Sequence, residues 1–234
     1  MITTTAEITA YDGRTMTILP KTSLSRELVR KQIRTVEIRF TDGREISAEQ
    51  RRKIFAIIRD ISEWSGHDRE YLRYYFMQNF AEERDMPYFS LSDVEKSVAK
   101  DFITYLIEFC FECDIPTIDT MLNRTDDISK YLYMCLEHRK CAVCNSRAEV
   151  HHIDTVGMGR DREEIVHEGM EAVALCRKHH IEAHSRGQQF MKDNHIYGIK
   201  LDRYLCMKLR LKHGGGGNNK LFSRDKQLLQ LDCV

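Results

Sequence analysis

The chain has 234 residues, of which 42% are hydrophobic and 31% are charged, with only 3 prolines and 12 glycines. This composition is typical of a folded globular protein and excludes collagen-like and low-complexity chains. Basic and acidic residues balance at 36 each, but residues 21–59 carry 11 basic and 5 acidic side chains, whereas residues 60–130 carry 7 and 16. The basic segment favours contact with a polyanion, although a solvated helix face has the same pattern.

The sequence shows no membrane or export signal. It contains no run of about 18 uncharged apolar residues, and its first residues lack the basic start and apolar core of a signal peptide. We therefore expect a cytoplasmic protein with no membrane partner. In that compartment the eight cysteines are free thiols or metal ligands rather than disulfides.

The chain begins with short strand patterns. Residues 6–11 and 15–19 are rich in β-forming side chains and flank an Asp-Gly pair, which predicts a β-hairpin. A helix is predicted over residues 25–32. Residues 35–40 alternate apolar and polar side chains, which predicts a half-buried strand.

Helical patterns follow. Ser47 and Gln50 have the spacing of a capping box, and they predict the start of a core helix. Its apolar side chains recur at helical spacing: Ile54, Phe55, Ile57, Ile58, Ile61 and Trp64. A second helix is predicted over residues 68–81. Its aromatic stripe could stack on nucleic-acid bases, but this spacing favours core packing; the stripe consists of Tyr71, Tyr74, Tyr75 and Phe80.

A third helix is predicted to begin at a second capping box, Ser92 with Glu95, and to end near Cys113. One face of it should be buried, the face with Val94, Val98, Phe102, Leu106 and Cys110. Cys110 and Cys113 form a CxxC pair without a matching second pair, so we expect both in the core. A shorter helix should follow residues 126–127. The strand and helix patterns of residues 1 to about 130 therefore predict an α+β domain.

Two pairs of metal-binding residues stand out beyond that domain. Cys141 and Cys144 form a CxxC pair, and Cys176 and His179 form a CxxH pair after 31 intervening residues. Each pair can point two ligands at one ion, and two such knuckles make a closed tetrahedral site. The spacing predicts a structural zinc ion.

Four more histidines lie beside the zinc ligands: His151 and His152 after a short strand pattern, then His180 and His184 one helical turn apart. A single histidine is usually structural, but four so close to a zinc knuckle are hard to explain as core residues. The alternative is a structural zinc module whose histidines are exposed to solvent.

The segments VHHID and LCRKHHIEAH resemble the HNH nucleases, in which a β-hairpin and a helix hold a catalytic ion beside a zinc site. The resemblance implies that His151 is a metal ligand and that His152 is the general base. It implies that His180 closes the ion site, with His184 as a second ligand from the helix. The family's middle asparagine usually stands where this chain has Glu171, so the group that orients the base is left open.

The whole chain, over roughly residues 1–212, also resembles a phage family of HNH nucleases. The shared segments are residues 42–52, 89–93, 156–160 and 179–184. The stretch DGREISAEQRRKIFAIIRDISEW is further similar to the lambda-type NinB (Rap) recombination proteins, which act on branched DNA. That similarity implies a DNA-binding surface in the basic segment, and we assign DNA contacts there to Arg51, Arg52 and Lys53.

Phosphodiester hydrolysis fits these residue types. A neutral histidine can serve as a base near neutral pH, and a divalent ion relieves charge at the phosphate. Arg160 and Arg162, in a glycine-bearing loop, could clamp flanking phosphates through their forked guanidinium groups, although a solvated loop has the same pattern.

These observations predict an α+β protein of two domains: a NinB-like DNA-binding domain over 1–130 and an HNH (ββα-metal) nuclease domain over 131–212, followed by a Gly/Asn-rich tail over 213–234. The predicted activity is endonuclease cleavage of branched or recombination-intermediate DNA, with structural Zn²⁺ and catalytic Mg²⁺ or Mn²⁺. Phage recombination or single-strand-binding proteins and a second copy of the chain are predicted partners. The alternative is a non-catalytic zinc module that binds DNA or a phage replication or recombination protein.

Overall fold

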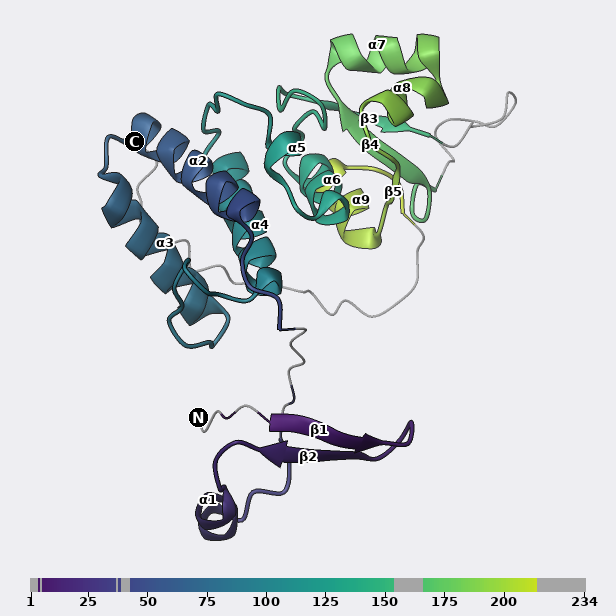
Figure 1. Ribbon diagram of the computed structural model, residues 1–234. Helices are drawn as coiled ribbons and strands as arrows, with labels where there is room; N and C mark the ends of the chain where they lie inside the picture. Colours follow the sequence, from purple (N-terminus) through teal and green to yellow (C-terminus); the bar gives the residue numbers. More distant parts are fainter. Residues whose placement is uncertain (1–3, 5, 37, 39–42, 154–165, 214–234) are drawn as a thin grey trace. The chain divides into compact units, whose positions relative to one another are not determined.

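The computed structural model describes residues 4, 6–36, 38, 43–153 and 166–213. The chain divides into two compact units, residues 1–42 and 43–234 (Figure 1). Both contain helices and strands, so the chain is an α+β protein, as predicted. None of the helices in these described ranges is long and apolar enough to cross a membrane.

The first unit contains a hairpin and a helix. The hairpin pairs β1 (Ala6–Tyr11) with β2 (Met16–Pro20) in antiparallel orientation, and α1 (Ser25–Lys31) follows. The Asp12 carboxylate fixes the turn by accepting hydrogen bonds from the backbone N–H groups of Arg14 and Thr15. The predicted hairpin and helix are confirmed. The strand predicted over residues 35–40 is absent at its three described positions, and its other three positions lie outside the described residues.

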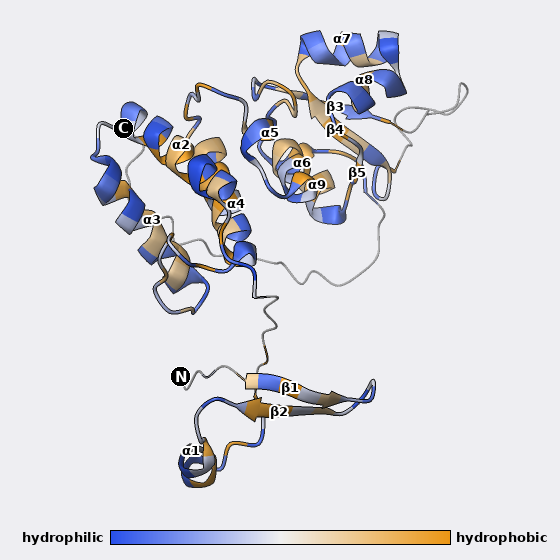
Figure 2. Cartoon of the chain, viewed as in Figure 1, coloured by the Kyte–Doolittle hydropathy of each residue, from blue (hydrophilic) through white to orange (hydrophobic). Residues whose placement is uncertain are grey.

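The second unit begins with a helical body. Its helices are α2 (Ala48–Ser65), α3 (Arg69–Glu83), α4 (Lys96–Glu112), α5 (Met121–Arg124) and α6 (Ile128–Glu137). Both halves of the predicted capping box start α2, since Ser47 N–H donates to the Gln50 side chain and Gln50 N–H donates to Ser47 Oγ. Figure 2 shows hydrophobic residues along α2 and α4. These two helices pack against each other.

The buried face of α2 is narrower than predicted. Its four isoleucines are buried, but Phe55 is 43% exposed and Trp64 is 37% exposed. For Phe55 the reason is helical geometry, because it follows the buried Ile54 directly and turns about 100° from it. Trp64 lies in the last turn of the helix. The prediction that Phe55 and Trp64 lie in the core was wrong.

The tyrosine stripe of α3 also lies mostly outside the core. Leu72, Phe76 and Phe80 form the buried face at four-residue spacing, whereas Tyr71 and Tyr74 are 52% and 54% exposed. Tyr71 stacks on Tyr75. The core prediction therefore holds for Phe80 and is wrong for Tyr71 and Tyr74.

Helix α4 begins later than the predicted capping box. Ser92 lies in a turn, Glu95 occupies the N-cap position without a capping bond from its side chain, and the helix starts at Lys96. The cause is a long-range pairing, because the Val94 carbonyl accepts a hydrogen bond from Ile46 N–H. A carbonyl engaged in this way does not serve the first turn of a helix. Downstream, Cys110 is buried and Cys113 is half-buried, in line with the prediction that they are core residues.

A small sheet completes the second unit. Strand β4 (Glu171–Leu175) lies between β3 (Glu149–His152) and β5 (Ile199–Lys200), and all pairs are antiparallel. The remaining helices are α7 (Arg177–Arg186), α8 (Gln188–Asp193) and α9 (Arg203–Leu209). Helix α7 packs against β3 and β4, and α6 packs against β4. The hairpin and helix predicted for the nuclease domain are therefore present. The domain boundary near residue 130 stays a prediction, and the tail from residue 214 lies outside the described residues.

Candidate metal centres

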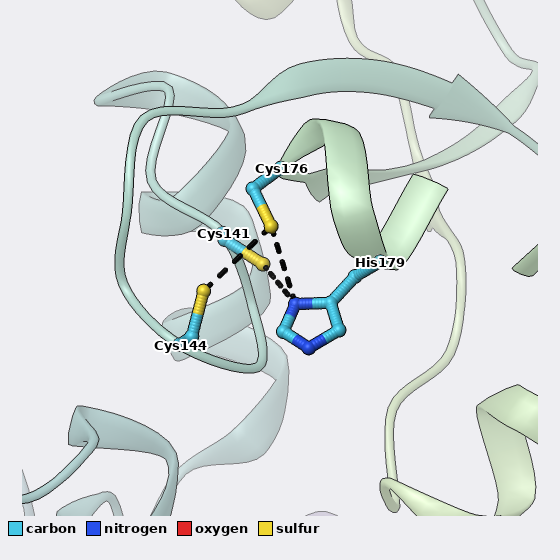
Figure 3. Close-up of side chains that lie close together, drawn as sticks. All are labelled: Cys141, Cys144, Cys176 and His179. Carbon is cyan, nitrogen blue, oxygen red and sulfur yellow. Dashed lines mark hydrogen bonds between the residues drawn. The ribbon is translucent and has the colours of Figure 1, made fainter. Parts of the chain in front are cut away.

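The four predicted zinc ligands converge at one point. The first knuckle is a tight turn in which Cys141 N–H donates to the Ser146 carbonyl and Asn145 N–H donates to the Cys141 carbonyl. The second knuckle is the start of α7, where Cys176 is the N-cap residue and His179 lies in the first turn. Figure 3 shows the three sulfurs and the His179 ring pointing toward one another.

The distances fit a single zinc ion. His179 Nδ1 lies 3.3 Å from Cys141 Sγ and 3.3 Å from Cys176 Sγ, and Cys144 Sγ lies 3.7 Å from Cys176 Sγ. Ligands of a tetrahedral zinc are separated by about 3.5 Å for a nitrogen and a sulfur and by about 3.8 Å for two sulfurs. Burial raises the pKa of the Cys141 thiol, so a cation is needed for it to be a thiolate at neutral pH.

A second cluster brings together three of the predicted ion ligands. Strand β3 presents His151, and α7 presents His180 and His184 one turn apart. The ring centroids are 4.8 Å apart in all three pairs, and one nitrogen from each ring lies within 4.8 Å of the others. The sheet and the helix thus aim three imidazoles at a common point.

One atom of this cluster lacks a partner. His151 Nδ1 is buried and makes no hydrogen bond within the described part of the chain. Burial, together with the neighbouring histidines, lowers the pKa of His151 to about 4, so the ring is neutral at neutral pH. A neutral ring with an unused nitrogen is the form that binds a divalent ion, and the cluster therefore fits a divalent metal ion.

Glu149 contacts the three-histidine cluster through His180. Its carboxylate oxygen Oε2 lies 3.0 Å from His180 Nδ1 and 3.7 Å from the Arg177 guanidinium. A carboxylate on one ring nitrogen fixes the ring orientation and directs the other nitrogen to the ion.

We expect Glu149→Ala to weaken binding of the divalent ion by about 10- to 100-fold, the usual effect of removing such a carboxylate. Titration of zinc-loaded protein with Mn²⁺ measures the change. Glu182→Ala is the matched control, because Glu182 is a glutamate of α7 itself whose carboxylate accepts a hydrogen bond from Arg186 instead of contacting a histidine of the cluster. If both substitutions weaken ion binding equally, Glu149 acts only through its negative charge and not through its contact with His180.

His152 has different contacts from its neighbour His151. Its Nε2 lies 2.8 Å from Nδ1 of His167, which follows the undescribed residues 154–165. Adjacent side chains of a strand point to opposite faces, and the contacts agree, since His151 meets α7 while His152 meets His167. The described contacts therefore do not include His152 in the three-histidine cluster.

Two of the three described residues predicted to contact DNA already bind groups within the chain. Arg52 is exposed, whereas Lys53 binds Asp126 at 2.5 Å and Arg51 donates to the Ser92 carbonyl at 3.2 Å. Arg160 and Arg162 lie outside the described residues. The DNA contacts of all five residues stay predictions.

Glu171, at the position of the family's usual asparagine, starts β4. Its carbonyl accepts a hydrogen bond from Ile153 N–H, directly after His152 in the chain. This backbone bond anchors the end of β3 without using the Glu171 side chain.

A third group of possible ligands is already engaged. Glu108, Glu137 and His138 offer ligand atoms within 4.8 Å of one another. However, Glu137 Oε1 accepts hydrogen bonds from Tyr204 and Lys208. Because that lysine charge already compensates the carboxylate, we assign this group to structure.

Two residues that contact histidines of the candidate site, Glu149 and His167, were not predicted from the sequence. Glu149 stands two positions before His151, which is the spacing that places two side chains on one face of a strand. His167 is a further histidine between the two zinc knuckles. Strand spacing could have indicated Glu149, but nothing local indicates the partner of His167.

Residues 19–212 of the chain match a family model with the description "Putative HNHc nuclease". The match spans most of the chain and contains both clusters, His152 and His167. No curated protein and no solved structure matches the chain. The chain therefore belongs to this family of HNH nucleases.

Proposed function

We propose that the chain is a metal-dependent DNA endonuclease. The observation that carries the proposal is the three-histidine cluster, in which His151, His180 and His184 converge and a buried nitrogen of His151 has no hydrogen-bond partner in the described structure. A module that only binds DNA has no need of such a cluster in addition to the Cys3His cluster. Membership of the nuclease family supports the same activity.

Cleavage of a phosphodiester requires a nucleophile in line with the leaving oxygen and relief of negative charge. When bound, a divalent ion supplies that relief at the phosphate and at the leaving 3′ oxygen. His151, His180 and His184 would hold the ion. An imidazole that binds a metal carries no charge, so the positive charge of the ion would stay available to the phosphate.

His152 is the general base in this proposal. Its ring takes a proton from the attacking water. The two histidines of the VHHID segment face different partners, and in-line attack needs the base and the ion on opposite sides of the phosphorus. The alternation of side chains along β3 meets that need with two adjacent residues.

The Cys141, Cys144, Cys176 and His179 cluster would hold a structural zinc ion. The ion would tie the loop before β3 to the start of α7, and a hydrogen bond from Ala142 N–H to the Ala174 carbonyl joins the same loop to β4. The zinc thereby fixes the elements that carry His151, His180 and His184.

The preferred substrate is proposed from the sequence resemblance. The similarity to recombination proteins favours branched DNA, and phage recombination or single-strand-binding proteins and a second copy of the chain are the proposed partners. Cytoplasmic location and a DNA-binding role for residues 1–130 belong to the same proposal.

A cleavage panel tests the proposed function. Linear duplex, flap, D-loop and four-way junction DNAs of equal length are incubated with the full chain and Mg²⁺ or Mn²⁺. We expect cutting that depends on the ion, with the branched DNAs cut fastest. If the chain binds these DNAs but cuts none of them with either ion, the binding-module alternative replaces the nuclease.

Arg52 offers the cleanest test of the basic segment, because Lys53→Glu would also break the ion pair with Asp126. We expect Arg52→Glu to weaken DNA binding and to lower the slope of log affinity against log salt by about 0.9 for each phosphate that is no longer neutralised. Arg84→Glu is the control, since Arg84 is exposed but lies in the acidic segment. An unchanged salt slope in Arg52→Glu would show that Arg52 makes no phosphate contact and only keeps the exposed face of α2 hydrated.

A further inference from the structure

The candidate general base has a partner that the usual HNH pattern does not provide. The family's asparagine position is occupied by Glu171, whereas the His152 ring is bonded to His167. The bond joins His152 Nε2 and His167 Nδ1 at 2.8 Å, and the ring centroids are 4.8 Å apart.

This distance indicates a hydrogen bond and not a shared metal site. Two histidine nitrogens bound to one tetrahedral ion are separated by about 3.3 Å, because each lies about 2.0–2.1 Å from the metal. A separation of 2.8 Å lies within the range of a direct N–H···N hydrogen bond. One nitrogen therefore donates a proton and the other accepts it.

The backbone holds His167 in place. Its N–H donates to the Lys212 carbonyl, and its carbonyl accepts from Met170 N–H in a tight turn. That turn contains Gly169 at φ +84°, a conformation that other residues rarely adopt. Gly169 N–H donates in turn to the Leu201 carbonyl. Three segments of the chain thus fix the His167 backbone before any substrate binds.

We propose that His167 is the positioning residue of the general base, an inference that rests on the proposed function. His152 Nε2–H donates to His167 Nδ1, which sets the tautomer of His152 and the orientation of its ring. His152 takes a proton from the attacking water. An O–H bond of the water breaks as the proton passes to the imidazole, and the hydroxide oxygen attacks phosphorus while the 3′ oxygen leaves.

Substitutions at His167 separate this role from simple packing. In asparagine, Oδ1 occupies nearly the place of histidine Nδ1, whereas the polar end of glutamine lies nearer the place of Nε2. We expect His167→Ala and His167→Gln to lower kcat by about 10- to 100-fold, the usual effect of a misplaced catalytic group. We expect His167→Asn to stay within a few-fold of the wild type. KM, zinc content and the Mn²⁺ requirement should not change.

A double substitution gives a second readout. If His167 acts only through His152, adding His167→Ala to His152→Ala causes no further loss of the residual rate. A further loss equal to that of His167→Ala alone would overturn the proposal. So would His167→Ala at the wild-type rate, or His167→Asn as slow as His167→Ala.

A magnetic resonance measurement tests the bond without any cleavage. In ¹⁵N-histidine-labelled full chain loaded with zinc, we expect a coupling across the hydrogen bond between His152 Nε2 and His167 Nδ1. It should vanish in His167→Ala and remain in His67→Ala, a change of an exposed histidine in another part of the unit. Absence of the coupling, or a proton on His152 Nδ1 in the neutral ring, overturns the positioning role. The coupling measurement does not depend on activity. If the wild type cuts no DNA, the proposed function fails, but the measurement still shows whether His167 holds the His152 ring.

Discussion

We expect His152→Ala to leave only a residual rate of DNA cleavage, with zinc content, folding and DNA binding intact. In the proposed mechanism the imidazole acts on the attacking water, and loss of a general base typically slows a reaction by about 10²–10⁴-fold. Single-turnover cleavage of a labelled duplex measures this loss directly. His67→Ala is the matched control, because it removes an exposed histidine outside both clusters.

The ion ligands should respond differently from the base. His151→Ala and His180→Ala weaken binding of the catalytic ion, so excess Mg²⁺ or Mn²⁺ partly restores their activity, whereas His152→Ala is not restored. A strong loss in His184→Ala makes it a direct ligand, and a mild loss makes it a residue of the helix face. Wild-type cleavage by His152→Ala would show that the base is wrongly assigned.

Replacing Cys141 with serine should remove the zinc ion and unfold the elements that it ties together. The wild type should contain about one zinc per chain, and structural zinc contributes on the order of 10 kcal/mol to small domains. Metal analysis measures the zinc, and hydrogen exchange locates the loss. Protection should fall in β3, β4 and α7 and remain in α2 and α4, whose buried core contains no zinc ligand.

Cys113→Ser is the control for the zinc prediction, since Cys113 is a half-buried cysteine outside the Cys3His cluster. It should keep the zinc and the exchange pattern of the wild type. Purified wild type with an intact fold and no zinc would contradict the structural role of the ion.

Local signals in the sequence predicted much of the fold. The capping box of Ser47 and Gln50 and the predicted start of a helix after residues 126–127 depend on atoms within a single helical turn. The structure contains the capping box and begins α6 directly after Asp127. The start of α4 was not predictable in this way. It depends on Val94 pairing with Ile46, two residues that are distant in the sequence.

In the candidate site, too, the features that depend on local sequence were predictable and those that depend on distant residues were not. Zinc ligands occur in local pairs, so their spacing predicted the Cys3His cluster that the structure assembles. The place of His167 depends on a turn held by the carbonyls of Leu201 and Lys212. Since no short segment contains both the turn and its acceptors, the pairing of His167 with His152 was not predictable from local sequence.

The most direct test of the proposed ion site is an ion titration of DNA cleavage. Gel-filtered protein that retains its zinc is mixed with plasmid DNA and increasing Mg²⁺ or Mn²⁺. We expect no cutting before the ion is added, saturable cutting afterwards, and a higher half-saturating ion concentration for His151→Ala. Cutting that is independent of added ion, or identical ion dependence in His151→Ala, would contradict the proposed nuclease mechanism.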